Sequence, residues 1–214
     1  ELAPPANGVA NQQDAGAFWK DFIKETAPEF RKPTIMQLET FIKPTWQALI
    51  DGAMFCEPQL KEIIERVKPD VVVEDNVLCF PALMTAEAPF VRIVSCNPLE
   101  MKGPEIAPTF SGYAQADSSK WEEFRREYER THREMWTDFN DFVTLAGAPT
   151  LPYLEFIHTS GYANLYVFPE EVDYTDMRAL DHTWHRMDSS VRSTDAKYEI
   201  PAAVSDRPGD SALI

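Results

Sequence analysis

The sequence has little glycine: 8 residues out of 214, against the ~7% that is usual in globular proteins. The nearest candidates for a phosphate-binding turn are Gly103-Pro104 and Pro208-Gly209-Asp210. Neither has the spacing of a dinucleotide fingerprint or a P-loop. The scarcity of glycine therefore excludes a glycine-rich phosphate loop from this chain.

Cysteine is also scarce. The three residues, Cys56, Cys79 and Cys96, are an odd number in apolar surroundings. That pattern is typical of reduced thiols in a core and not of a disulfide framework. We expect Cys79 and Cys96 to be buried and inert, and the protein to be cytoplasmic.

Positively charged residues are fewer than negatively charged ones, and long apolar runs are absent. Against 35 Asp and Glu stand only 20 Lys and Arg, a formal net charge of −15, which argues against nucleic acid and anionic membranes as partners. No stretch approaches the ~20 apolar residues of a membrane helix. The start at Glu1 resembles neither a signal peptide nor a native start, and we expect a segment upstream. Hydrophobic residues still make up 44% of the chain, enough for the core of a globular domain.

Apolar spacing in the first half predicts helices over 15–30 and 34–50, the second bent at Pro44, and a further helix that begins at Pro58 and stops at Lys68-Pro69. The β-branched run at 70–74 and the apolar run at 90–95 predict buried parallel strands, joined by a short helix within 80–88.

In the second half, residues 97–118 form a long loop without a sustained period, and loops of that length are usually functional. Ser119 and Glu122 match a capping box at the start of a long helix that ends at Gly147. Strands are expected over 163–168 and, more weakly, near 185–188. The predicted fold is α/β, with a mostly parallel, Rossmann-like sheet and helices on both faces.

Asp75 follows the first predicted strand, where open α/β sheets bind their ligands. A carboxylate there either orients a histidine that acts as general base or caps the next helix, and residue type leaves both open. His132 is expected on the polar side of its helix, and His182 and His185 in a structural loop without zinc spacing.

Aromatic and sulfur-containing side chains gather around the strand ends and the long loop. They form either a core or an apolar cleft for a hydrophobic small molecule. They are Phe80, Met84, Met101, Phe110, Tyr113, Trp121 and Phe124.

Three segments, residues 68–76, 81–83 and 94–98, resemble the amino-terminal, acceptor-binding domain of UDP-sugar-dependent glycosyltransferases of the GT-B fold (family 1). The resemblance continues through 108–113, 165–171 and 184–192 and ends at 206–208, covering most of the chain. It is closest to bacterial members that act on small lipophilic compounds.

The resemblance implies inverting transfer from a UDP-sugar to a hydroxyl of a hydrophobic acceptor, with no metal and no cofactor. A histidine deprotonates the acceptor in this family, and an aspartate that Asp75 matches pairs with that histidine. The residues that we expect to contact the acceptor are Asn76, Phe80, Asn97, Met101, Phe110, Tyr113, Trp121 and Phe124.

The resemblance also divides the chain. Residues 1–192 correspond to the acceptor-binding domain without its first strands and helix, and 193–214 to the interdomain linker and the start of a missing donor-binding domain. The histidine has no counterpart, so we expect no sugar transfer by the chain alone. The competing hypothesis is a non-catalytic module that binds hydrophobic small molecules. An α/β-hydrolase is disfavoured, because no G-x-S-x-G sequence is present.

Without the missing strands, the 70–74 strand lies at the edge of the sheet. It is mostly valine and contains no lysine or proline that would discourage pairing. We therefore expect the isolated chain to self-associate through this edge, to aggregate, or to be stable only with the missing segments supplied in trans.

Overall fold

The computed structural model describes residues 15–187, and the predicted linker and start of a donor-binding domain at 193–214 lie outside this range. Four strands form a single sheet in the order β1-β2-β3-β4, and every neighbouring pair is parallel. Their bounds are Val72–Asp75 for β1, Phe90–Val94 for β2, Ala163–Tyr166 for β3 and Trp184–Arg186 for β4. The predicted α/β class and parallel sheet are confirmed.

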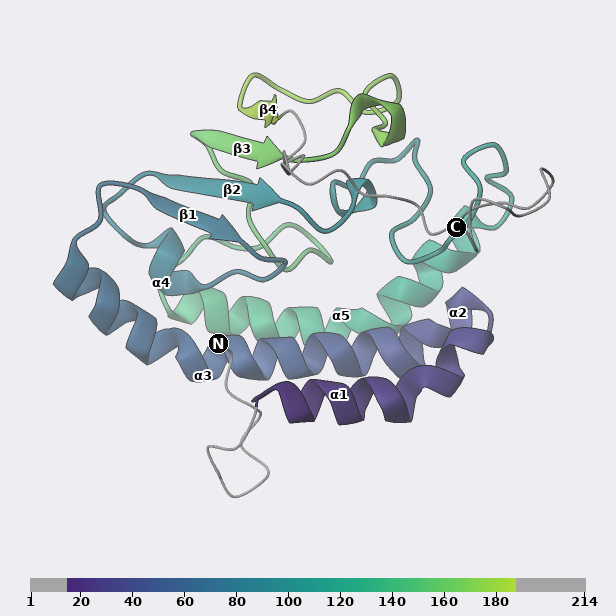
Figure 1. Ribbon diagram of the computed structural model, residues 1–214, viewed down its shortest axis with the longest axis horizontal. Coiled ribbons are helices and arrows are strands. Elements are labelled where there is room, and N and C mark those ends of the chain that lie inside the picture. Colours follow the sequence, from purple (N-terminus) through teal and green to yellow (C-terminus); the bar gives the residue numbers. More distant parts are fainter. Residues whose placement is uncertain (1–14, 188–214) are drawn as a thin grey trace, which may run out of the picture.

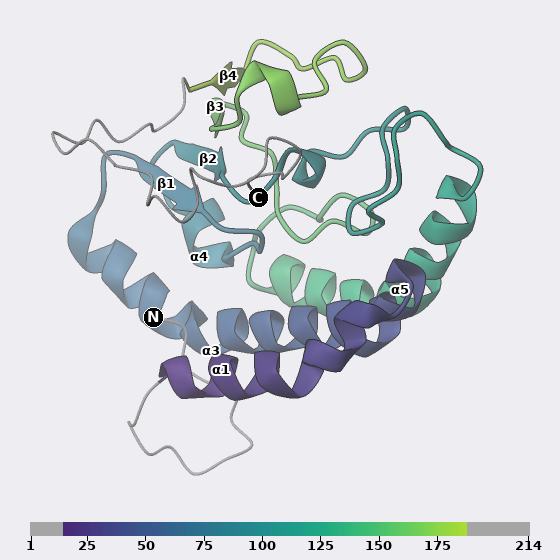
Figure 2. The same cartoon turned by 45° about the vertical axis from the view of Figure 1, so that its right-hand side comes forward.

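One face of the sheet is covered and the other is partly bare. In β1, Val72 and Glu74 are buried, whereas Val73 and Asp75 on the opposite face are exposed. The long helices α1 (Ala15–Thr26), α3 (Lys43–Val67) and α5 (Trp121–Leu145) all lie on the covered side (Figures 1 and 2). Within residues 15–187, long helices therefore cover one face, where the sequence predicted helices on both.

The first half is helical as predicted, with different breaks. After α1 come the short 3-10 helix η1 (Ala27–Arg31), α2 (Thr34–Gln37) and the π-helical turn η2 (Leu38–Ile42), which leads directly into α3. The prediction that Pro58 starts a new helix is wrong, because Pro58 lies inside α3. Proline has no backbone N–H, so one carbonyl oxygen of the preceding turn lacks its helical partner. Because Pro58 is exposed, water can bond that carbonyl instead. Helix α3 bends along its length (Figure 1).

The predicted short crossover helix is confirmed, since α4 spans Pro81–Met84 within the expected 80–88. The start of α5 differs from the prediction. The residue that caps α5 is Lys120, without a side-chain bond, so the predicted capping box at Ser119 is wrong; the backbone N–H of Ser119 instead donates to Asp117. The other end agrees: Gly147 follows α5 with a φ of +97°, the left-handed conformation that glycine adopts without strain.

The main core lies between α3, α5 and the segments around 77–84 and 148–156. It includes Ile50, Leu78, Phe139, Val143 and Phe156. His132 is fully buried, so its predicted place on a polar face is wrong. No helix among residues 15–187 is both long and apolar enough to cross a bilayer.

Candidate functional site

A cavity of about 330 Å³ lies beyond the carboxyl ends of β1 and β2. Val77 comes from the segment after β1, and Cys96 and Asn97 from the segment after β2. This strand-end cavity is walled mostly by apolar side chains, and parallel α/β sheets bind ligands in this position. The apolar wall includes Phe41, Ile42, Trp46, Leu49, Phe110 and Phe156.

Ring contacts define the shape of the wall. The Trp46 ring stacks on Phe156 with centroids 4.7 Å apart and meets Phe110 edge-on at 6.4 Å. Phe110 in turn stacks on Tyr128 at 6.3 Å. Phe110 has a φ of +70°, which strains a residue with a Cβ. The loop therefore holds this ring against its neighbours at an energetic cost.

Four charged residues interrupt the apolar lining: Arg92, Glu100, Lys102 and Glu155. Arg92 Nη2 donates to Glu100 Oε1 at 2.9 Å in a pair that is nearly closed to solvent, with side-chain exposures of 4% and 13%. Burial raises the pKa of Glu100, and the neighbouring guanidinium of Arg92 opposes that rise. Glu74, directly opposite Arg92 in the sheet register, is also buried.

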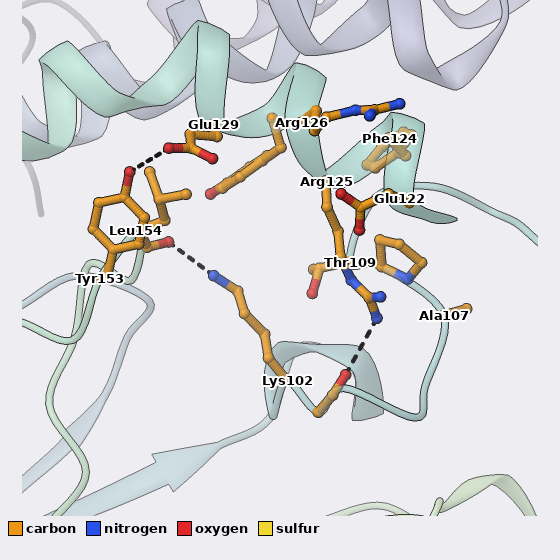
Figure 3. Close-up of a pocket in the computed structure, with 13 residues that line it drawn as sticks. Lys102, Ala107, Thr109, Glu122, Phe124, Arg125, Arg126, Glu129, Tyr153 and Leu154 are labelled. Atoms are coloured by element: carbon orange, nitrogen blue, oxygen red, sulfur yellow. Dashed lines mark hydrogen bonds between the residues drawn. The ribbon is translucent and has the colours of Figure 1, made fainter. Parts of the chain in front are cut away.

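A second cavity of about 370 Å³, the loop cavity, adjoins the first and shares Lys102, Thr109 and Tyr128 with it. Figure 3 shows Lys102 extending toward Leu154, whose carbonyl accepts from its Nζ at 2.8 Å. The same ammonium lies 5.3 Å from the centre of the Tyr128 ring. Enclosure lowers the pKa of Lys102. Lys102 therefore marks the boundary between the two cavities.

On its other side the loop cavity is closed by the first turns of α5. Arg125 Nη2 donates to the carbonyl oxygens of Pro104 at 2.9 Å and Ile106 at 3.0 Å, and so fixes the long loop to the helix. Tyr153 donates to Glu129 at 2.6 Å across the wall (Figure 3). The predicted long loop is thus a structural part of both cavities.

Asp75 is the last residue of β1 and is exposed, and it is not among the residues that line the strand-end cavity. Its Oδ1 accepts a hydrogen bond from the Ser95 hydroxyl at 2.6 Å, which ties the end of β1 to the end of β2. The alternative that Asp75 caps the next helix is wrong, because Phe80 caps α4 and no side chain bonds there. The carboxylate is therefore free of a capping role and open to solvent.

Two of the residues predicted to contact an acceptor line the strand-end cavity: Asn97 and Phe110. Asn97 Oδ1 also accepts from the backbone of Leu99 at 3.0 Å and caps the short helix η3 (Pro98–Glu100). Phe124 lines the loop cavity, and Tyr113 packs against its ring with centroids 5.5 Å apart.

The other predicted contacts lie outside both linings. Phe80 belongs to the main core, and Met101 to a smaller cluster with Val94, Tyr166 and Phe168. Trp121 is buried beneath Arg125, whose guanidinium is 5.5 Å from its ring. Asn76 Oδ1 accepts from the backbone of Val77 at 2.7 Å and shapes the turn after β1.

Sequence reasoning missed the charged lining of the cavity. Arg92 interrupts an otherwise apolar strand, Phe-Val-Arg-Ile-Val. A charge buried in such a strand needs a partner, and that signal points toward Glu100 or another nearby carboxylate. No comparable signal marked Trp46 or Phe156, because their helical and loop positions are equally consistent with the core.

The cysteines divide differently from the prediction. Cys79 is buried, as expected, and burial raises the pKa of its thiol. Cys96 is exposed at the strand-end cavity, so its predicted burial is wrong. Partial enclosure and the carboxylates of Glu100 and Asp75 raise its pKa, which lowers its reactivity at neutral pH.

Other features of the described residues compete less well for a ligand. A groove of about 740 Å³ lies near Lys68, Asp70 and Ala88, at the amino ends of β1 and β2 and away from the usual ligand position. Within residues 15–187, no three His, Cys, Asp or Glu side chains gather as a metal site would require.

A scan of the sequence against models of protein families finds no match, and a search of curated proteins finds no significant relative. The function of this chain is therefore inferred from the two cavities and the residues in and beside them.

Proposed function

We propose that this chain is the acceptor-binding part of a glycosyltransferase that moves a sugar from a UDP-sugar to a hydroxyl of a hydrophobic small molecule. The observation that carries the proposal is the apolar strand-end cavity, with the exposed Asp75 bonded to Ser95, the residue before the lining residue Cys96. An apolar acceptor gains free energy when such a wall removes it from water. An exposed carboxylate at the end of β1 suits a group that must orient and charge-stabilise a histidine base.

Acceptor binding is tested directly on Cys96, because its thiol lies at the cavity. Alkylation by iodoacetamide is followed by peptide mass spectrometry, with and without lipophilic phenols or flavonoids. The expected result is slower modification of Cys96 in the presence of a bound compound. Cys56 is the internal reference, because it lies outside the cavity lining. Equal protection of both thiols would contradict binding at this site.

Catalysis is tested in a transfer-competent protein that contains this chain, with UDP-glucose as donor and product read by mass spectrometry. Asp75→Asn should lower kcat by about 10³- to 10⁴-fold, as in other enzymes whose aspartate orients a histidine. Ser95→Ala is the matched control, because it removes the hydroxyl that bonds Asp75 and keeps the carboxylate. We expect that variant to retain activity within about tenfold of wild type. Unchanged activity of Asp75→Asn would contradict the catalytic role.

The second candidate is a binding module without transfer activity. It is favoured by the observation that no histidine is among the described residues that line the two cavities, so neither lining supplies a base for the transfer. Protection of Cys96 by hydrophobic compounds, together with no transfer from any UDP-sugar, would support this candidate over the first.

A further inference from the structure

Lys102 lies where the strand-end cavity and the loop cavity adjoin, since it lines both. The residue is exposed, and Figure 3 shows its ammonium extending across the loop cavity toward Leu154. One of its three N–H groups donates to the Leu154 carbonyl at 2.8 Å. No second acceptor bonds the ammonium among residues 15–187, so two N–H groups are left for a ligand.

Tyr128 supplies a second hydrogen-bond donor at the same boundary, because it also lines both cavities. Its hydroxyl has no partner in the described part of the chain, and its oxygen is not one of the buried atoms sealed from solvent. The ring is held in place by stacking on His132 at 4.1 Å and on Phe110 at 6.3 Å. Burial raises the pKa of the hydroxyl, so it stays protonated and donates at neutral pH.

Thr109 is the third residue that the two linings share. Its hydroxyl already donates to the Leu99 carbonyl at 2.6 Å, so it offers a ligand no hydrogen. The boundary therefore presents two free donors, the Lys102 ammonium and the Tyr128 hydroxyl. A carboxylate matches them, because both of its oxygens accept hydrogen bonds and neither donates one.

Charge favours a carboxylate over a neutral acceptor. Lys102 forms no ion pair within residues 15–187. Enclosure lowers its pKa, the charge of Glu155 opposes that fall, and the charge of Arg92 adds to it. The ammonium is thus enclosed without a carboxylate in contact. Hydrogen bonds between oppositely charged groups are about twice as strong as neutral ones.

Carboxylates in the two linings would repel a ligand anion. Glu100 is neutralised by its pairing with Arg92 at 2.9 Å, and Glu129 accepts from Tyr153 in the loop cavity. Glu155 lines the strand-end cavity without an ion pair among the described residues. It is therefore the carboxylate that weakens binding of an anion next to Lys102.

We propose that the strand-end cavity takes an apolar carboxylic acid, whose carboxylate accepts hydrogen bonds from the Lys102 ammonium and the Tyr128 hydroxyl. The inference rests on the proposed function, since it specifies the acceptor as one that carries a carboxylate besides the hydroxyl that receives the sugar. Lys102 and Tyr128 then determine specificity for that carboxylate, and the aromatic wall binds the apolar body.

The test compares ligands that share one apolar body. Binding of 2-naphthoate, 2-acetonaphthone, 2-(aminomethyl)naphthalene and 2-methylnaphthalene to the full 214-residue chain is measured at pH 7 by equilibrium dialysis. The carboxylate should bind at least about tenfold more tightly than the neutral ketone, the amine and the hydrocarbon. Each bound compound should also slow the alkylation of Cys96, which lies at the same cavity.

Two variants remove the donors one at a time. Lys102→Met should weaken binding of 2-naphthoate by about tenfold or more and leave binding of 2-methylnaphthalene within about threefold. Lys61→Met, in the groove at the amino ends of the strands, makes the same change of charge outside both cavities and should leave both affinities unchanged.

Tyr128→Phe removes a hydroxyl that no described residue bonds and keeps the ring, so it leaves the packing of the wall intact. It should weaken binding of 2-naphthoate by about three- to tenfold. Tyr162→Phe, at an exposed tyrosine, is its matched control and should have no effect. Glu155→Gln should act in the opposite direction and strengthen binding of 2-naphthoate, because it removes the repelling charge.

Four results would overturn the inference. Binding of the ketone or the hydrocarbon as tightly as 2-naphthoate, with Cys96 protected, would do so and leave the proposed function standing. Tightest binding of the amine would show that the carboxylates of the linings select the ligand. Unchanged affinity for 2-naphthoate in both Lys102→Met and Tyr128→Phe would exclude the two donors. Binding of none of the four compounds would overturn both the inference and the proposed function. The wild-type series and Tyr128→Phe decide these outcomes even where Lys102→Met fails to fold.

Discussion

Glu74 is a carboxyl group enclosed between the sheet and the helices, with no hydrogen-bond partner for either oxygen among residues 15–187. Burial raises its pKa to about 8, although the charge of Arg92 across the sheet register works in the other direction. In the unfolded chain the same group titrates near 4.5. Between these two values the folded state holds the extra proton, so stability falls as pH rises from about 4.5 through 8.

Glu74→Gln removes this titration and keeps the shape of the side chain. We expect the variant to be more stable than wild type by roughly 2–5 kcal/mol above pH 8 and nearly equal to it at pH 4.5. Urea unfolding at both pH values measures the difference. Glu65→Gln, at an exposed position, should show no such pH dependence. A Glu74→Gln variant that is less stable than wild type at pH 9 would contradict this account.

His132 makes the folded chain less stable as the pH becomes acidic. It is fully buried and stacks on Tyr128 at 4.1 Å, and its Nε2 has no partner in the described part of the chain. Burial lowers its pKa from 6.5 to about 4. The unfolded chain therefore binds a proton that the folded chain excludes, and stability is lost as pH falls from 6.5 toward 4. His158 is also buried, and its lowered pKa acts in the same direction.

His132→Leu should remove part of this acid sensitivity. The wild-type chain is expected to lose up to about 3 kcal/mol through His132 between pH 6.5 and 4, and the variant should lack that share. Thermal unfolding followed by circular dichroism across this range measures it. His182→Leu provides the control at an exposed histidine. Identical pH profiles for wild type and His132→Leu would show that the histidine does not carry the effect.

At the scale of elements, the end of α5 depends on one glycine. Ala146 and Ala148 donate to the carbonyls of Phe142 and Val143, and Gly147 adopts a φ of +97° between them. A Cβ at Gly147 would meet only an ordinary contact, 3.9 Å from a methyl group of Thr85. Any loss of stability there comes from the backbone and not from crowding.

Gly147→Ala should therefore destabilise the fold by about 1–2 kcal/mol, the usual cost of a left-handed conformation in a residue with a Cβ. Gly161→Ala is the matched control, because no atom lies within 4 Å of its added Cβ and its backbone does not need a positive φ. We expect that control to stay within about 0.5 kcal/mol of wild type. Chemical denaturation measures both variants, and equal effects at the two positions would refute the assignment.

For the whole molecule, the open edge of the sheet is the main prediction. β1 pairs with β2 on one side and has no partner on the other among residues 15–187. Val73 is 53% exposed on the uncovered face. An unpaired strand edge beside exposed valines offers backbone groups and apolar surface to a second chain. Self-association through β1 remains the expected behaviour.

Val73→Lys tests this edge, because a lysine there adds charge repulsion between two copies. Analytical ultracentrifugation at tens of micromolar should show larger species for the wild type and a shift toward monomer for the variant. Val67→Lys makes the same change at an exposed position near the end of α3 and should not shift the distribution. A wild-type chain that sediments only as monomer would contradict the prediction.

The periodic patterns in the sequence were sufficient to predict most helices and strands and the α/β fold class. The valine-rich run before Asp75 and the apolar run before Cys96 are strands, and the helix ends at Gly147, because these features depend on neighbours in the sequence. The same local information placed Asp75 at a strand end. This local information failed to predict the position of Pro58, which lies inside α3 and does not begin a helix. An exposed position tolerates the missing N–H of a proline.

The sequence by itself determined the α/β class, the parallel strands and the position of Asp75 at their carboxyl ends. Only the tertiary structure decided which aromatic rings line a cavity and which fill the core, since Phe110 and Phe80 have the same chemistry. It also decided that Arg92 meets Glu100. Local propensity acts between neighbours in the chain, whereas a cavity and its charge pairs arise from segments that meet only when the core closes around them.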